Sequence, residues 1–420
     1  MSTGDRRVVL TGMGVRAPGG HGTAGFWDLL TSDRTATRTI TAFDPAPFRS
    51  RIAAEVDFDP VVEGFDGAEV ADRDRVVLLA LACVRDAVRD CGLDLARRDP
   101  TRIAVSIGSA VGSTISLDRD YRRISRDGST WLVDHVPASA RSRDHQVPAS
   151  LARDVAREVA AEGPVAVIST GCTSGLDAVG HGAELIRDGR ADLVLAGAAD
   201  APISPITVAC FDAIRATSPN NADPAHAARP FDRRRDGFVL GEGAAVFVLE
   251  ERAAALRRGA RVHAELAGFA GRCNAFHMTG LHPEGRELSW AITAALRAAG
   301  RDRVDYLNAH GSGTKQNDRH ETAAIKRSFG AAAHRIPISS IKSKVGHSLG
   351  AVGSVELAAC VLAMRHGVIP PTANHAEPDP ECDLDYVPGA PREADLDVVL
   401  SIGSGFGGFQ SAVVLTKGDR

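Results

Sequence analysis

The sequence lacks any paired cysteine motif. Its seven cysteines are an odd number, include no CxxC spacing and are scattered along the chain: Cys83, Cys91, Cys172, Cys210, Cys273, Cys360 and Cys382. This pattern argues against a disulfide framework and against a zinc site, so we expect no bound metal. We expect most of these thiols to be small buried hydrophobic groups in a protein of the reducing cytoplasm.

Long hydrophobic segments are also lacking. Met1 to Arg7 is polar and the apolar stretch after it is broken by glycines, so no signal peptide is expected. The longest apolar run, Val76–Val84, lies between two arginines and is far too short to cross a bilayer. The sequence therefore predicts a cytoplasmic protein that does not enter a membrane.

Charge of one sign is not in excess. The chain has 49 Lys and Arg against 53 Asp and Glu, a net charge of −4, which leaves no basic footprint for nucleic acid. Lysine itself is scarce, and nearly all of the basic residues are arginine. Together with the abundant alanine and glycine, this indicates a bias in genome composition. Two of the few lysines, Lys342 and Lys344, nevertheless stand in one short segment.

The remaining composition is that of an ordinary globular protein. Hydrophobic residues make up 44% of the 420 residues and charged residues 24%, which excludes extended disorder, and the length favours two or three domains. Short β-branched segments alternate with Ala/Leu/Arg-rich helical ones, which predicts an α/β fold with buried parallel or mixed sheets. Strands are expected at 7–10, 103–107, 165–169, 193–196, 246–250, 262–266, 306–308, 336–341 and 398–402. Helices are expected at 75–90, 150–161, 175–187, 251–258, 289–299, 321–329 and 350–364.

Two segments of the chain resemble each other. Pro164–Gly180 and Pro337–Gly353 align without a gap, and each reads as a strand, a glycine-containing turn and a helix. Ser106–Gly112 and Ser401–Gly407 also share the pattern SIGSxxG, although at another spacing, so this similarity can reflect turn chemistry alone. The first pair predicts two related halves, residues 1–255 and 256–420, joined near residues 251–262.

Cys172 is the cysteine in a distinctive context. It follows the expected strand at 165–169 and precedes a helix, in the sequence TGCTSG of Thr170–Gly175. The free amides and the positive dipole end of a helix N-terminus favour a thiolate, so the pKa of this thiol is expected to be lowered. Cys172 is therefore our candidate nucleophile.

Two histidines occupy comparable turns. His347 lies in the turn of the repeated segment, close to the position that aligns with Cys172, and His310 follows the expected strand at 306–308. An imidazole near a helix N-terminus is pushed towards its neutral form, in which it can donate a hydrogen bond. If the two halves pack about a pseudo-two-fold axis, these turns converge on one site with Cys172.

Glycine-rich turns suggest different roles in different places. Gly403, Gly405, Gly407 and Gly408 surround Phe406, and successive amides in such a turn can hold an oxyanion together with the Cys172 amide. By contrast, Gly12–Ala17 imitates a dinucleotide fingerprint but is followed at once by Pro18, so no phosphate-binding helix can start there. Gly311–Lys315 lacks the spacing of a P-loop.

Six motifs together are similar to those of the β-ketoacyl synthases, the condensing-enzyme family. They are Ser169–Asp177 (STGCTSGLD), Arg229–Asp232 (RPFD), Gly237–Gly243 (GFVLGEG), Asn308–Thr314 (NAHGSGT), Lys342–His347 (KSKVGH) and Gly403–Gly408 (GSGFGG). The resemblance covers about Arg7 to Thr416. Within the family, Ala201–Ile214 and Gly313–Thr322 most resemble the ketosynthase alpha subunit of actinorhodin-type bacterial type II polyketide synthases.

The resemblance implies a thiolase fold, a five-layered αβαβα arrangement of two duplicated halves. It implies that Cys172 accepts the acyl chain and that His310 and His347 assist decarboxylation of malonyl-acyl carrier protein in a Claisen condensation. Lys342 falls at the catalytic lysine of the family and Glu356 at its acidic supporting partner. Related sequences usually carry an apolar residue at Lys344, so this cation is expected either to perturb His347 or to face solvent.

The resemblance also implies how substrate and partners are held. Phe406 matches a gating residue whose amide shares the oxyanion hole with Cys172, Val111 a residue of the acyl channel, and Ser312 and Thr314 the hydroxyls that contact phosphopantetheine. That arm is delivered by acyl carrier protein, and no bound cofactor is expected. The expected partners are acyl carrier protein and a chain length factor (ketosynthase beta) in a heterodimer.

Other classes of protein remain as alternatives. A fatty-acid elongating 3-oxoacyl-acyl carrier protein synthase shares Cys172, His310 and His347, and product analysis separates it from a polyketide enzyme. A chain-length-factor-like subunit has the same fold without the cysteine, so Cys172 disfavours it. A chalcone-synthase-like enzyme has asparagine in place of His347, and a thiolase typically needs a second active-site cysteine.

Overall fold

Hydrogen-bonded strands run through the whole protein as one 11-stranded sheet. The computed structural model describes residues 6–130 and 136–418. The strand order is β12-β11-β15-β16-β10-β1-β9-β7-β5-β6, with β2 paired to β1. Strands β1 and β10 pair at two positions, Val9 with Glu265 and Leu10 with Ala264, whereas most other neighbours in the path share longer registers. The sheet therefore divides at β1 and β10 into an N-terminal and a C-terminal half.

The two halves have the same topology. The N-terminal strands are β1 (Val8–Ala17), β5 (Ile103–Gly108), β6 (Val165–Ile168), β7 (Leu193–Asp200) and β9 (Gly243–Glu251). The C-terminal strands are β10 (Ala264–Cys273), β11 (Tyr306–Asn308), β12 (Ile338–Ser339), β15 (Val398–Ser404) and β16 (Phe409–Thr416). In each half the spatial order is third, second, fourth, fifth, first, with the same parallel and antiparallel neighbours. This repeat confirms the predicted duplication. The predicted boundary at 255 and 256 falls within α9 (Arg252–Arg257) and stays a prediction.

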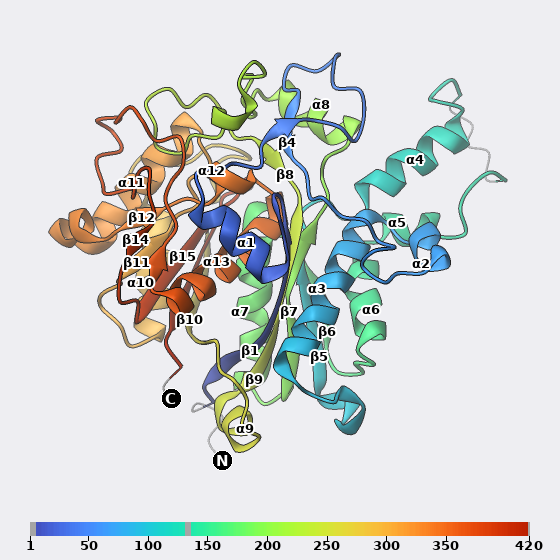
Figure 1. The fold of residues 1–420 in the computed structure, drawn as a ribbon, viewed down its shortest axis with the longest axis horizontal. Helices are drawn as coiled ribbons and strands as arrows, with labels where there is room; N and C mark the ends of the chain where they lie inside the picture. The colour runs from blue at the N-terminus through green and yellow to red at the C-terminus, as the bar shows by residue number, and fades with distance from the viewer. Residues whose placement is uncertain (1–5, 131–135, 419–420) are drawn as a thin grey trace.

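Helices cover both faces of each half-sheet (Figure 1). Helices α3 (Arg75–Cys91) and α6 (Ala149–Glu158) lie outside the N-terminal strands, and α10 (Arg286–Ala298) and α11 (Lys315–Phe329) lie on the outer side of the C-terminal half. Helices α7 (Ser174–Arg187) and α13 (Val352–His366) pack on each other between the two half-sheets. Three clusters of buried hydrophobic residues fill the spaces between these layers. The five layers confirm the thiolase fold.

The central helix α13 is buried on almost every side. Its residues from Val352 to Met364 are all buried, as the middle layer requires. The stretch Leu349–His366 is long and apolar enough to cross a membrane by length and composition, yet 89% of it is buried inside the protein. Its composition is accounted for by packing between two sheets.

Strand β1 extends further than the sequence predicts. The expected strand at 7–10 continues through the glycines to Ala17, because Gly12 and Gly14 allow helix α3 to lie directly on the strand. A Cβ on Gly14 would come within 2.0 Å of the carbonyl oxygen of Cys83, and one on Gly12 within 2.2 Å of that of Ala87. These glycines are needed for close helix–strand packing, so they do not mark a loop.

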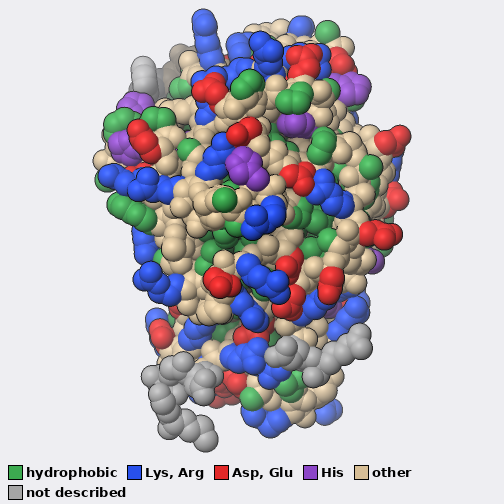
Figure 2. Space-filling view, turned by 90° about the vertical axis from the view of Figure 1, so that its left-hand side faces the viewer, with side chains coloured by type: hydrophobic (Ala, Val, Ile, Leu, Met, Phe, Trp, Pro, Cys, Tyr) green, Lys and Arg blue, Asp and Glu red, His purple; other side chains and the backbone are tan. Residues whose placement is uncertain are grey.

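Two small sheets and further helices complete the fold. A 3-stranded sheet is formed by β3 (Arg38–Thr39), β4 (Ile52–Ala54) and β8 (Leu240–Gly241), and a 2-stranded sheet by β13 (Val368–Ile369) and β14 (Arg392–Glu393). The strand β2 spans Gly20–His21. The other helices are α1 (Gly22–Thr31), α2 (Gly67–Asp72), α4 (Thr114–Ser125), α5 (Ser142–Gln146), α8 (Pro205–Ala213) and α12 (Lys342–Val345). On the face of the C-terminal half, basic and acidic side chains are interspersed (Figure 2).

Candidate active site

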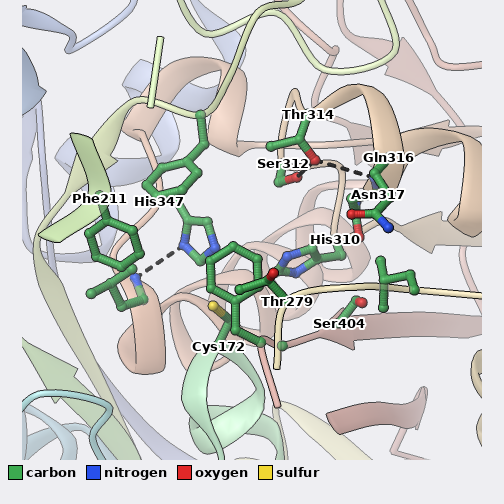
Figure 3. A pocket seen from close by; sticks show the side chains of 15 residues that line it. Cys172, Phe211, Thr279, His310, Ser312, Thr314, Gln316, Asn317, His347 and Ser404 are labelled. Atoms are coloured by element: carbon green, nitrogen blue, oxygen red, sulfur yellow. Dashed lines mark hydrogen bonds between the residues drawn. The ribbon is translucent and has the colours of Figure 1, made fainter. Parts of the chain in front are cut away.

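Four turns from the two halves meet at one cavity (Figure 3). Cys172 comes from the turn between β6 and α7, His310 from the end of β11, His347 from the turn after α12, and Phe406 from the β15–β16 hairpin. The space between these turns, part of which is open to solvent, is about 470 Å³. It is lined by Cys172, Phe211, Phe238, Thr279, Leu281, His310, Ser312, Thr314, Gln316, Asn317, His347, Leu349, Ser404, Gly405 and Phe406. The predicted convergence of Cys172, His310 and His347 is therefore present.

The cavity continues outwards to the protein surface. A second hollow next to it shares Thr279, Thr314, Gln316 and Phe406 with the cavity and is also lined by Ile214, Arg215 and Lys315. The Phe406 side chain is 38% exposed, so it stands between the cavity and solvent. A narrow group entering from outside would pass Phe406 before it reached Cys172.

The turn that carries Cys172 is held by a partly buried carboxylate. Asp177, in the first turn of α7, accepts hydrogen bonds from the hydroxyls of Thr170 at 2.5 Å and Thr173 at 2.9 Å. Ser411 of β16 donates a third at 2.5 Å, so one carboxylate joins the Cys172 turn to the C-terminal half. Cys172 thus occupies the predicted position at the start of a helix.

Burial opposes ionisation of the Cys172 thiol. It raises the pKa of this thiol to about 11, although the positive charge of Lys342 and the backbone amides of Phe406 and Cys172 act to lower it. The predicted lowered pKa is therefore wrong for the unacylated protein, because desolvation outweighs the helix terminus. The two amides that point at the sulfur are the pair of donors predicted for an oxyanion.

The β15–β16 turn lies directly against the turn that carries Cys172. A Cβ on Gly405 would come within 3.2 Å of the Cys172 nitrogen and 3.1 Å of the Thr170 carbonyl oxygen. The turn is closed by a hydrogen bond from the Gly405 amide to Phe409 and by one from the Gly407 amide to Met278. Glycine at 405 therefore permits the approach that places the Phe406 amide beside Cys172.

The two histidine rings lie edge to face in the cavity (Figure 3). Their centroids are 5.3 Å apart with an interplanar angle of 80°, and His347 also makes an edge contact with Phe238 at 5.1 Å. Burial, followed by the charge of Lys342, holds the pKa of each imidazole well below its usual value. Both rings are therefore neutral, as predicted for His347, and each retains one N–H to donate.

A hydrogen bond defines which nitrogen of His347 carries the proton. The backbone amide of Leu349 donates to Nδ1 of His347 over 3.1 Å. Because Nδ1 accepts this bond, the proton of the neutral ring lies on Nε2. The Nε2–H group is the one left to meet a substrate oxygen in the cavity.

Lys342 lies behind the histidines and does not line the cavity. Its ammonium donates to the backbone carbonyl of His310 and forms an ion pair with Glu356, and both side chains are buried. Burial raises the pKa of Glu356 to about 7 against the lowering effect of the Lys342 charge. The predicted pairing of Lys342 with Glu356 is thus present, and the lysine contacts the site through His310.

Glu321 is a site residue that the sequence did not single out. This fully buried carboxyl group on α11 accepts the backbone amides of His310 at 2.6 Å and Gly311 at 2.7 Å. Burial raises the pKa of Glu321 to about 8, against these two hydrogen bonds. The helix was predicted to start at Glu321, but it begins at Lys315, where the Thr314 hydroxyl accepts the Asn317 amide.

The residues expected to hold substrate differ in their placement. Ser312 and Thr314 line the cavity, and their hydroxyl oxygens are 3.1 Å apart. Val111 is not among the lining residues and packs in the adjoining apolar cluster that includes Phe238 and Leu349. Its amide donates to the buried Asp200 at 3.2 Å, and burial raises the pKa of that carboxyl group to about 6.

Lys344 neither faces solvent nor acts on His347. Its side chain is buried, and the ammonium donates to the backbone carbonyls of Ser32 at 2.6 Å and Arg34 at 3.2 Å. The amide of Ala36 in turn donates to the carbonyl of Lys344. Both expectations for this residue were wrong, because the side chain reaches a segment far away in the sequence and fastens it to α12.

Known proteins share this sequence and architecture throughout. Residues 5–255 match the family model of the β-ketoacyl synthase N-terminal domain, and residues 263–376 match that of its C-terminal domain. A tetracenomycin polyketide synthase ketoacyl synthase alpha subunit from Streptomyces glaucescens is 68% identical, with 98% of this chain and 97% of the relative covered. A 3-oxoacyl-[acyl-carrier-protein] synthase 2 from Coxiella burnetii is 39% identical, with 98% and 99% covered.

Solved structures agree with this relationship. A type II polyketide synthase ketosynthase, bound to a hexaketide and in complex with its acyl-carrier protein, aligns with a TM-score of 0.92 and 35% identity over 99% of this chain and 100% of the other. The ishigamide ketosynthase/chain length factor aligns with a TM-score of 0.90 and 35% identity over the same shares. On these matches, the chain belongs to the β-ketoacyl synthase family of acyltransferase-type condensing enzymes.

Proposed function

We propose that this chain is the catalytic ketosynthase (alpha) subunit of a bacterial type II polyketide synthase. It extends an acyl or polyketide chain, held as a thioester on Cys172, by decarboxylative condensation with malonyl-acyl carrier protein. One observation carries the proposal: a thiol with two amide donors and two neutral imidazoles open onto the same cavity. Higher identity to a polyketide ketosynthase than to the 3-oxoacyl synthase favours polyketide assembly.

The first step loads the nucleophile. Cys172 attacks the thioester carbonyl of an acyl chain on the phosphopantetheine arm, and the resulting oxyanion is held by the amides of Cys172 and Phe406. The carbon–sulfur bond to the arm then breaks, the acyl group stays on Cys172, and the thiol proton ends on the departing arm. The raised pKa of the thiol makes this proton transfer part of the step.

The second step uses the two histidines. His310 and His347 donate hydrogen bonds to the thioester oxygen of the malonyl group, which stabilises the enolate that forms as CO₂ leaves. The enolate carbon attacks the Cys172 thioester, forming a carbon–carbon bond and releasing the Cys172 thiolate, which takes up a proton. Neutral imidazoles suit this role, because each carries one N–H group that can donate a hydrogen bond to the thioester oxygen.

Other residues support these steps. Lys342, held by Glu356, positions His310 through its carbonyl. Burial keeps both imidazoles neutral, and the charge of Lys342 acts in the same direction. Ser312 and Thr314 contact the phosphopantetheine arm near the cavity, and Phe406 stands where the arm enters. Val111 belongs to the wall of the acyl channel beyond Leu349.

The chain acts together with a carrier protein and a partner subunit. No cofactor is bound by the chain itself, and the reactive groups arrive on the phosphopantetheine arm of acyl carrier protein. A chain length factor completes a cytoplasmic heterodimer. The two halves, residues 1–255 with Cys172 and residues 256–420 with His310 and His347, supply the nucleophile and the decarboxylating pair respectively.

Covalent labelling tests the nucleophile. Acyl-carrier protein carrying a labelled acyl group should acylate the wild-type chain once, at the Cys172 peptide, as read by mass spectrometry. The Cys172→Ala variant should acquire no label, whereas Cys210→Ala, which removes an exposed thiol, should label normally. Full acylation of Cys172→Ala would overturn the assignment.

Decarboxylation tests the histidines separately. CO₂ release from malonyl-acyl carrier protein should fall about 100-fold or more in His310→Ala, because one of two donors to the enolate oxygen is lost. Unchanged release would remove His310 from this role. Mass analysis of the product formed with a chain length factor then separates the alternatives, since a polyketide enzyme yields a poly-β-keto product and a fatty-acid synthase yields single extensions.

A further inference from the structure

The segment between β10 and α10 forms one wall of the cavity. We call residues 274–285 the strap. Thr279 and Leu281 of the strap line the cavity beside Cys172. The strap also holds the turn that carries Phe406: the Met278 carbonyl accepts the Gly407 amide at 2.6 Å, and the Asn274 amide donates to the Gly408 carbonyl at 2.9 Å. The placement of the strap therefore affects both the cavity wall and the oxyanion turn.

One buried side chain on α11 anchors the strap. The Nδ1 atom of His320, whose side chain is buried, lies 2.6 Å from the backbone carbonyl oxygen of His282. Since a carbonyl only accepts hydrogen bonds, the proton of the neutral ring lies on Nδ1. Burial lowers the pKa of His320, which keeps the ring in this neutral form.

Backbone contact places the end of the strap on the same helix. A Cβ on Gly285 would come within 2.4 Å of the Ala324 nitrogen and 2.6 Å of the His320 carbonyl oxygen. The strap therefore reaches α11 without an intervening side chain at this point. His320 holds the strap at His282, which lies three residues before Gly285.

The neighbouring residue on α11 holds the other side of the site. Glu321 accepts the amides of His310 and Gly311, while His320 holds His282. His320 also lies close enough to His310 that a charge on it would lower the pKa of His310. Two consecutive side chains thus connect the histidine loop and the strap to one turn of α11.

We propose that His320 is a positioning residue for the condensation: by donating its Nδ1–H to the His282 carbonyl, it fixes the strap and, through it, the Phe406 turn beside Cys172. This rests on the proposed function, because the strap matters only if acyl groups enter past Phe406. The ring does not line the cavity, so its effect passes through the strap. Loss of this one buried hydrogen bond should favour opening of the strap about tenfold.

Two amide substitutions test whether the position of the hydrogen-bond donor at residue 320 matters, or only the presence of a polar side chain. The amide of Asn can occupy the place of Nδ1, whereas that of Gln extends to the place of Nε2, so His320→Asn keeps the donor and His320→Gln misplaces it. Hydrogen exchange of strap amides, read by mass spectrometry on the full chain, should rise about tenfold in His320→Gln and stay near wild type in His320→Asn. In His320→Gln the kcat for acylation of Cys172 should fall while the KM for acyl-carrier protein changes less, because the Phe406 amide is held less firmly beside the sulfur.

Further variants guard against general destabilisation. His320→Leu should loosen the strap as His320→Gln does, and it replaces the latter if that variant does not fold. Ile325→Ala shortens a buried apolar side chain on the same helix and leaves the His320–His282 hydrogen bond in place, so it should lower stability without faster strap exchange. Wild-type exchange in both His320→Gln and His320→Leu, or equal loosening in His320→Asn, would overturn the proposal. Failure of Cys172 to acylate in the wild type would instead contradict the proposed function.

Discussion

At the scale of single residues, the Cys172 thiol lies between opposing influences. Burial raises its pKa to about 11, and the Lys342 charge and two backbone amides only partly compensate. Alkylation by iodoacetamide requires the thiolate, so its rate at Cys172 should rise about tenfold per pH unit from pH 7 to 10 without a plateau. The measurement is mass spectrometry of the Cys172 peptide in the unacylated protein. A plateau near pH 8 would show that the thiol ionises far more easily than its burial indicates.

Lys342 gives a second prediction at this scale. Its charge helps to hold the pKa of His310 and His347 well below the usual value, so both remain neutral as the pH falls below 6.5. In Lys342→Met that charge is absent and the histidine pKa values rise. Protonation then begins at higher pH, so the acid limb of malonyl decarboxylation should move upwards and the rate at pH 7 should fall about 10–100-fold.

The neighbouring lysine is the matched control. Lys344 is equally buried but bonds to Ser32 and Arg34, and its charge is not among the influences on either histidine. Lys344→Met should therefore leave the acid limb of the pH profile where the wild type has it. An equal shift in both variants would show that the effect is one of stability and not of local charge.

The placement of site residues was predictable where the signal is local in sequence. Cys172, His310 and Phe406 stand in turns whose glycines and flanking strands mark them, and the structure brings them together as expected. Lys344 and His320 could not be assigned in this way, because their partners, the carbonyls of Ser32 and His282, are set by packing between distant segments. A backbone carbonyl carries no sequence signal of its own.

At the scale of elements, the β15–β16 turn depends on one small residue. A Cβ at Gly405 would approach the Cys172 nitrogen to 3.2 Å, so Gly405→Ala should push the turn away and displace the Phe406 amide from the sulfur. Losing one oxyanion donor should lower kcat for acylation of Cys172 about 100-fold or more. Gly67→Ala, where nothing lies within 4 Å of the added Cβ, is the control for acylation rate and for thermal unfolding. Wild-type acylation by Gly405→Ala would contradict the role of this turn.

Elements were predicted well where the hydrophobic period was clear. Helix α3 starts at Arg75 and ends just before Gly92, as the pattern indicated. The backbone of Gly92 is in the left-handed conformation. Strand β16 was not predicted, and β1 was cut short at its glycines. The full length of β1 could not be predicted from the sequence, because its glycines are explained only by the helix α3 that packs on them.

At the scale of the whole molecule, topology decides which sequence repeats reflect duplication. The segments that begin at Pro164 and Pro337 lead into β6 and β12, which hold equivalent positions in the two halves. The SIGSxxG segments end β5 and β15, which are not equivalent, so that similarity reflects turn chemistry alone. Each half contributes what the other lacks, and the site lies where their strand ends meet.

The same topology leaves one edge of the sheet for a partner. The strand order ends at β6, where Val165 is 44% exposed, whereas β12 at the other end is buried. An exposed apolar edge strand favours pairing with another chain, so on the proposed function we expect the chain length factor to cover β6. Val165→Lys should weaken the heterodimer about tenfold or more, measured by analytical ultracentrifugation, because a charge would be buried there without a partner. Val62→Lys, at a valine that is 81% exposed elsewhere, should leave the affinity unchanged, and equal effects of the two substitutions would exclude β6 as the contact.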